Sequence, residues 1–121
     1  MDKVDIKYLG IPNICFSLTD KADKREKKFI KQRIKNGFDD SETWSLYNTI
    51  AEFIYPRLKR YKEVSNGTPM GLTKNEWNDI LDKMIFSFKY ANDDTIEEKE
   101  NYDKFEEGIN LFAKYFLQLW W

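Results

Sequence analysis

The chain has 121 residues, of which 34 % are charged and 17 % aromatic, yet it contains no histidine and a single cysteine. Histidine is the usual general base and a common metal ligand, and structural zinc sites are built from Cys and His. This composition predicts a binding protein rather than an enzyme, with no cofactor and no metal site. Basic and acidic residues number 20 and 21, for a formal net charge of −1, which argues against general nucleic-acid binding.

Length and cysteine usage bound the class of protein further. The length fits a single helical domain over residues 1–121. The lone Cys15 cannot form an internal disulfide, which favours a reducing cytoplasm. No apolar run approaches the roughly 18 residues that a membrane-spanning helix needs, so no membrane association is expected.

The first two predicted elements are an arm and a basic helix. In the segment from Met1 to Leu18, Val4, Ile6 and Tyr8 alternate with the charged Asp5 and Lys7 before Gly10 and Pro12 interrupt the pattern. This indicates a short strand or an extended arm. A helix is predicted over residues 21–36, ended by Gly37 in the left-handed conformation. Residues 20–36 carry eight Lys/Arg against three Asp/Glu, and the apolar stripe is thin: Phe29, Ile30 and Ile34.

A longer helix is predicted after Phe38. Asp39 can cap it, with Glu42 reaching back as in a capping box. One face then recurs at steps of three and four: Trp44, Tyr47, Ala51, Ile54, Leu58 and Tyr61. Pro56 lies inside this pattern and predicts a kink or a break near Tyr55, because it removes a backbone hydrogen bond and clashes with the preceding turn.

Two more capping boxes, Thr73 to Glu76 and Thr95 to Glu98, predict two further helices. The apolar faces that follow them are Trp77, Ile80, Leu81, Met84, Ile85 and Phe88, and then Phe105, Ile109, Phe112, Phe116 and Leu119 down to the carboxyl terminus. Gly108 in the last helix is tolerated where a neighbour approaches closely, or is incidental. The predicted fold is all-α, a bundle of about four helices with a short extended or β N-terminal arm.

The candidate ligand site is the run Phe53 to Lys62, in which basic side chains alternate with aromatic ones. Guanidinium groups beside aromatic rings suit phosphate and base recognition. The candidate ligand-binding residues are Phe53, Tyr55, Arg57, Lys59 and Arg60. The alternative is that basic residues near a helix C-terminus only offset the helix dipole and remain solvated.

Acidic residues form a second pattern. Residues 92–107 carry eight acidic and two basic residues, opposite in charge to the helix over 21–36. The two segments either face each other, within one molecule or between subunits, or form separate docking surfaces. Asp39, Asp40 and Glu42 offer oxygen ligands that suit Mg²⁺, as do Asp93, Asp94, Glu97 and Glu98, but capping explains acidic residues in first turns better.

Two tryptophans, Trp120 and Trp121, end the sequence. Tryptophan is enriched where interfaces concentrate their binding energy, so both are candidate interface residues, and a homo-oligomer is expected. The alternative is that one indole closes the core.

From Gly37 to about Asp94 the chain resembles a family of small, mostly uncharacterised bacteriophage proteins. Three segments carry the resemblance: Gly37 to Leu46, Pro56 to Lys62, and Leu72 to Ile85. Relatives often carry an acidic residue where this chain has Tyr47. The resemblance implies a phage-encoded protein acting in the host bacterial cytoplasm, and it carries over no catalytic residue.

Two functions follow from these patterns. The leading hypothesis is a non-enzymatic binding protein that counters host defence by sequestering a small phosphorylated, nucleotide-like signal. The alternative is an inhibitor that docks directly on a host defence protein, with the terminal tryptophans in its contact surface. A minor structural or packaging role in the virion fits a helical bundle but has no residue-level support.

Overall fold

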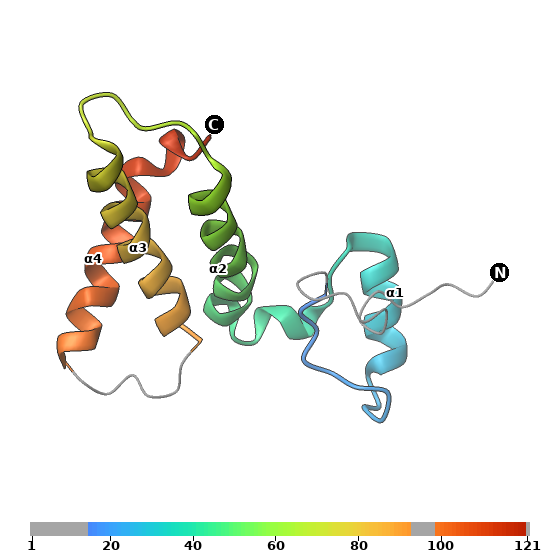
Figure 1. The fold of residues 1–121 in the computed structure, drawn as a ribbon. Coiled ribbons are helices and arrows are strands. Elements are labelled where there is room, and N and C mark those ends of the chain that lie inside the picture. Colours follow the sequence, from blue (N-terminus) through green and yellow to red (C-terminus); the bar gives the residue numbers. More distant parts are fainter. Residues whose placement is uncertain (1–14, 93–98, 121) are drawn as a thin grey trace. The chain divides into compact units, whose positions relative to one another are not determined.

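The computed structural model describes residues 15–92 and 99–120, and this part of the chain is all-α, with four helices and no strand (Figure 1). In chain order the elements are α1 (Glu26–Asn36), the 3₁₀ turn η2 (Asp40–Thr43), α2 (Leu46–Val64), α3 (Lys74–Tyr90), α4 (Lys99–Tyr115) and the 3₁₀ turn η3 (Phe116–Gln118). The all-helical class is therefore confirmed. Most of the predicted N-terminal arm lies outside the described residues, and residues 15–18 have no regular secondary structure.

The chain divides into two compact units, Met1–Ile50 and Ala51–Trp121. The first unit, called unit 1 below, contains α1, η2 and the first residues of α2. The second, called unit 2, contains the rest of α2 together with α3, α4 and η3. The expectation of one domain over the whole chain stays a prediction.

Helix α1 begins five residues later than the sequence pattern predicts. Asp20 and Asp23 each accept a hydrogen bond from a backbone N–H two residues on, that of Ala22 at 2.9 Å and that of Arg25 at 2.8 Å. Such side-chain bonds offer the backbone an alternative to the helix, so the chain turns twice before α1 starts. At the other end Gly37 adopts φ +84° and its N–H bonds the carbonyl of Arg33, as predicted.

The capping box at Asp39 and Glu42 is present, but it starts the single turn η2 rather than a long helix. The regular helix α2 begins only at Leu46. It then runs without interruption through Pro56 to Val64, so the break that was one predicted consequence of Pro56 does not occur. The sequence therefore predicted the position of this capping box correctly, but the element that begins there is one 3₁₀ turn and not the long helix that was expected.

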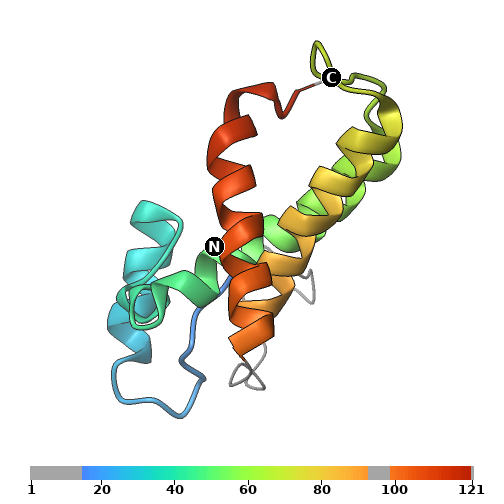
Figure 2. The same ribbon diagram turned by 90° about the vertical axis from the view of Figure 1, so that its left-hand side faces the viewer.

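Helices α3 and α4 approach each other closely. In Figure 2 they lie together at the end where α3 finishes and α4 begins, and they diverge toward their other ends. Gly108 of α4 lies at the close approach: a Cβ built on it would stand 1.9 Å from Ser87 Oγ and 2.2 Å from the carbonyl oxygen of Lys83. Ser87 Oγ also donates to the carbonyl of Phe105 across the interface, at 2.7 Å. Gly108 is therefore a packing requirement and not an incidental residue.

The core of unit 2 is apolar and lies between α2, α3 and α4. Its buried members are Ala51, Leu58, Trp77, Leu81, Met84 and Phe88. The capping box of Thr73 and Glu76 at the start of α3 is formed as predicted. The second box, at Thr95 and Glu98, lies outside the described residues. Helix α4 ends at Tyr115 rather than continuing to the carboxyl terminus, and the final segment turns through η3.

Candidate functional site

The residues proposed to bind a ligand lie on the part of α2 within unit 2 and separate into two groups. In the first, the guanidinium of Arg57 stacks on the exposed ring of Phe53, with 3.9 Å between Cζ and the ring centroid. Arg57 also donates to the backbone carbonyl of Phe53 at 2.8 Å. Arg60 forms an exposed ion pair with Glu63 at 2.9 Å. Both arginines therefore have partners within α2, which an incoming phosphate must replace or share.

The second group is Tyr55 and Lys59, whose ammonium lies 5.4 Å from the tyrosine ring centroid. Lys59 borders a small depression of about 280 Å³ between α2 and α3, where Lys62 pairs with Asp82 at 2.6 Å. Carboxylates of Asp82 and Glu63 line the same depression. The structure thus places the five predicted residues on one helix without bringing them into a common pocket.

The described terminal tryptophan, Trp120, keeps most of its side chain in solvent, with 72 % exposed. Its backbone is held, because Tyr61 Oη on α2 donates to the Trp120 carbonyl at 3.0 Å. Trp121 lies outside the described residues. The alternative in which the indole of Trp120 fills the core is therefore wrong, and Leu119 is the partly buried residue that packs against the core instead.

Trp120 belongs to an exposed apolar surface at the end of unit 2. It borders an open depression of about 650 Å³ together with Gln118 and the loop residues 67–70. Met70 in that loop is fully exposed, and Leu117 in η3 is 82 % exposed. We call Met70, Leu117 and Trp120 the C-terminal apolar surface. A contiguous exposed apolar patch is a common mark of an interaction site on a protein surface.

Unit 1 contains a buried ionic cluster that the sequence analysis did not find. Arg33 lies at its centre, 5 % exposed, and forms ion pairs with Glu26 at 2.5 Å and with Asp39. The hydroxyl of Thr19 donates to Glu26 at 2.5 Å, and that of Ser41 donates to Asp39. In the sequence, Arg33 is one of many basic residues of a charged helix, and nothing indicates that it is buried. The one signal for this cluster was the capping box, which gives Asp39 a structural role.

The cluster also fixes the segment that precedes α1. The backbone N–H of Phe16 donates to Glu42 Oε1 at 3.3 Å, and that of Leu18 donates to Ser41 Oγ at 2.9 Å. The carboxylates of Asp39 and Glu42 are thus occupied by donors of the protein itself. No group of three or more His, Cys, Asp or Glu residues suited to a metal ion occurs in the described part of the chain.

The environment of Asp39 has a consequence for pH. Burial opposes ionisation of this carboxyl, but hydrogen bonds from Ser17, Ser41 and Arg33 outweigh it and hold its pKa below the usual value. Because the pKa of Asp39 is lower in the folded than in the unfolded state, its contribution to stability is complete above about pH 4, the unfolded value. We expect this contribution to disappear as the pH falls through the folded-state pKa.

The test is to measure the free energy of unfolding in urea across the acidic range, for the native chain and for Asp39→Asn. The native chain should lose more stability on acidification than the variant, because the variant has no carboxyl to protonate at this position. Parallel curves for the two proteins would show that Asp39 does not contribute to the pH dependence.

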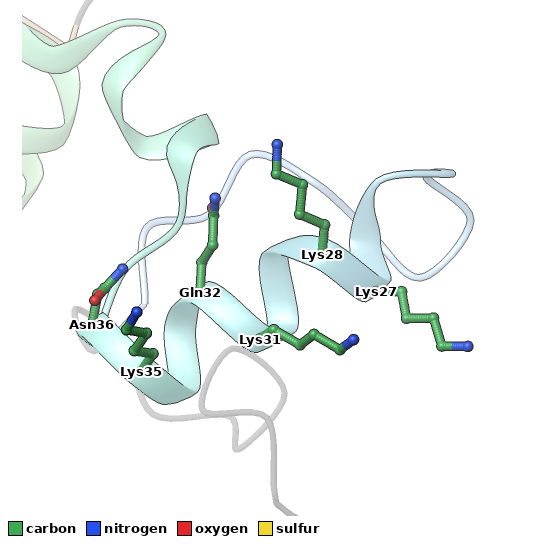
Figure 3. Close-up of a pocket in the computed structure, with 6 residues that line it drawn as sticks. All are labelled: Lys27, Lys28, Lys31, Gln32, Lys35 and Asn36. Atoms are coloured by element: carbon green, nitrogen blue, oxygen red, sulfur yellow. The ribbon is translucent and has the colours of Figure 1, made fainter.

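The outer surface of α1 is strongly basic. Four exposed lysines border a shallow depression together with Gln32 and Asn36; they are Lys27, Lys28, Lys31 and Lys35. Figure 3 shows that their side chains point in different directions and do not converge on one point. This surface therefore does not form a pocket for a single small anion.

Comparison with known protein families, curated proteins and solved structures finds no match to this chain. None of the described helices is both long enough and apolar enough to cross a bilayer.

Proposed function

We propose that this protein is a non-enzymatic, phage-encoded binding protein that counters host defence by docking on a host protein. The observation that carries the proposal is the C-terminal apolar surface: Met70 and Trp120 stand largely in solvent at the border of an open depression, and Leu117 of η3 is largely exposed as well. Tryptophan and methionine are enriched in protein interfaces, and tryptophan is enriched among the residues that contribute most of the binding energy. The bacteriophage origin rests on the resemblance carried by Gly37 to Leu46 and the two later segments.

The backbone beneath this surface supports a docking role. Tyr61 holds the final described residues through the carbonyls of Gln118 and Trp120, at 3.4 and 3.0 Å. Leu117 and Trp120 are therefore presented by a segment that hydrogen bonds hold to α2, whereas Met70 lies in the loop before α3. An anchored surface can bind a partner without first paying the entropy of ordering the chain.

Sequestration of a small phosphorylated signal is the second candidate, and one observation favours it. The guanidinium of Arg57 lies over the exposed ring of Phe53, so that a cationic group and an aromatic ring are presented together at the surface. Such a pair suits a phosphate and a base. It ranks second because Arg60 is paired with Glu63, and because the depression beside Lys59 also carries the Asp82 carboxylate.

One experiment separates the two candidates. A surface variant, Met70→Ser/Leu117→Ser/Trp120→Ser, is compared with a charge variant, Arg57→Glu/Arg60→Glu. The native chain and both variants are each used as bait in bacterial lysate, and the captured protein and the small molecules released on denaturation are identified by mass spectrometry. A captured protein is then purified and its affinity for the native chain and both variants is measured directly.

The docking proposal predicts that the surface variant loses at least tenfold in affinity for the purified partner, since each hot-spot side chain contributes about 2 kcal/mol or more. The charge variant should bind the partner as the native chain does. The reverse result, with a nucleotide-sized molecule carried by the native chain and lost only from the charge variant, would establish sequestration instead. Circular dichroism of both variants verifies that the helices are intact.

A further inference from the structure

The exposed surface of α1 carries more positive charge than the composition of unit 1 suggests. Helix α1 turns Glu26, Phe29 and Arg33 inward and leaves the four lysines around its outer surface. None of Lys27, Lys28, Lys31 and Lys35 forms an ion pair within the described part of the chain. We call these four residues the α1 lysine surface.

The reason for the imbalance is the buried cluster. Glu26, Asp39 and Glu42 are all buried, with 1–5 % of each residue exposed, and their carboxylates face Arg33 and hydroxyl or backbone donors. Unit 1 thus buries three negative charges and only one positive charge, that of Arg33. A chain that is nearly neutral overall thus presents a local patch of uncompensated lysines.

An exposed aromatic ring stands at the N-terminal edge of this helix. Trp44 has 49 % of its surface in solvent and packs edge-on against Phe29, with ring centroids 5.9 Å apart. The guanidinium of Arg25 lies 4.6 Å from the Trp44 ring centroid. Lysines for phosphates and an aromatic ring for stacking are the two components of a sequence-tolerant site for single-stranded nucleic acid.

We propose that the α1 lysine surface, together with Trp44, binds single-stranded nucleic acid. Lys27, Lys31 and Lys35 follow one another at intervals of four residues, which places successive positions about 6 Å apart along the helix axis. Their divergent side chains on a convex helix (Figure 3) suit an extended chain of phosphates rather than one compact anion. This inference concerns unit 1 and is independent of the C-terminal apolar surface in unit 2.

The expected binding free energies favour nucleic acid, rather than the acidic surface of another copy of the chain, as the partner of these lysines. The outer side of α4 carries Asp103, Glu106 and Glu107, and Glu107 is already paired with Lys83 at 2.8 Å. Exposed ion pairs contribute about 0–1 kcal/mol each, so a few of them do not hold two proteins together. A polyanion releases condensed counterions at every phosphate that is neutralised, which makes even four lysines effective.

The test is fluorescence anisotropy with a labelled oligothymidylate of about 16 nucleotides, the upper range for one compact binding domain. We expect a dissociation constant of roughly 10⁻⁴–10⁻⁶ M, as for non-specific binders. With four phosphate contacts, the slope of log K against log salt concentration should be about −3 for a single strand. Binding should also quench tryptophan fluorescence, and Trp44→Leu should remove most of that quenching.

The deciding comparison uses two variants with the same loss of charge. The first, Lys27→Gln/Lys28→Gln/Lys31→Gln/Lys35→Gln, should lose at least tenfold in affinity and show a flatter salt slope. The second, Lys74→Gln/Lys89→Gln/Lys104→Gln/Lys114→Gln, removes four exposed lysines from unit 2 outside the candidate ligand site and should bind as the native chain does. Equal losses in both variants, no binding by the native chain, or tighter binding to duplex DNA or anionic vesicles than to the oligothymidylate would each overturn the proposal.

Discussion

Replacing Arg33 with methionine is expected to destabilise unit 1 by about 3–5 kcal/mol, the usual effect of removing one partner from a buried ion pair. The variant leaves Glu26 and Asp39 buried without the guanidinium that bridges them. Methionine fills much of the arginine volume, so the loss reflects the unpaired carboxylates rather than a cavity. The measurement is urea unfolding in a Trp77→Phe/Trp120→Phe/Trp121→Phe background, in which Trp44 of unit 1 is the remaining tryptophan and its fluorescence reports on that unit.

The matched control is Lys31→Met on the same helix. Lys31 is exposed and has no ion pair within the described part of the chain, so its replacement should change stability by no more than about 0.5 kcal/mol. A second variant, Arg33→Met/Glu26→Gln/Asp39→Asn, removes both charges left behind and should recover part of the loss. If Arg33→Met and Lys31→Met unfold at the same urea concentration, the cluster does not stabilise unit 1.

Replacing Gly108 with alanine should separate α3 from α4 and cost about 1–3 kcal/mol, as overpacking generally does. The added methyl would stand 2.2 Å from a backbone oxygen, that of Lys83, which cannot rotate away as a side chain would. Relief requires the helices to move apart, which lengthens the hydrogen bond from Ser87 to the Phe105 carbonyl. Thermal and urea unfolding of the variant measure the loss.

The sign of this effect distinguishes packing from helix propensity. Alanine favours a helix over glycine by about 1 kcal/mol, so Gly108→Ala would stabilise the protein if the position were open. Ala113→Gly, at an exposed position of α4, supplies the propensity difference alone. Gly108→Ala combined with Ser87→Ala removes the Oγ atom of the nearer contact without placing a glycine inside α3, and should recover part of the stability. A variant more stable than the native chain would contradict the close approach.

The elements that the sequence predicted best are those whose signals are local. The capping box at Thr73 and Glu76 involves four consecutive residues, and both of its hydrogen bonds are formed. Gly37 ends α1 in the left-handed conformation because an adjacent residue decides that geometry. The box at Asp39 and Glu42 shows the limit, since it is formed as well but begins only the single turn η2.

The predicted apolar stripe along α2 was right in its later part only. Ala51 and Leu58 are buried in the core of unit 2, as the periodicity indicates. Trp44 and Tyr47 continue the same pattern toward the N-terminus, yet about half or more of each residue is exposed. Periodicity shows which residues share a face of a helix, but whether another element covers that face depends on the rest of the fold.

The candidate site shows the same division. The sequence correctly places Phe53 and Arg57 on one side of a helix, because helical geometry fixes that relation. It does not show that Arg60 pairs with Glu63, or that Asp82 of α3 lies beside Lys62. Binding by the five predicted residues stays a prediction, which the charge variant tests.

The sequence by itself determined the all-α class, the cap at the start of α3, the glycine that ends α1 and the absence of histidine chemistry, since these depend on residue types and short spacings. Only the tertiary structure decided that Arg33 is buried, that Gly108 is required, and that Met70, Leu117 and Trp120 remain in solvent. Each of these depends on residues far apart in the chain, or on the lack of a covering element. A long side chain such as arginine can equally be solvated or buried with partners, and the surrounding fold selects between the two.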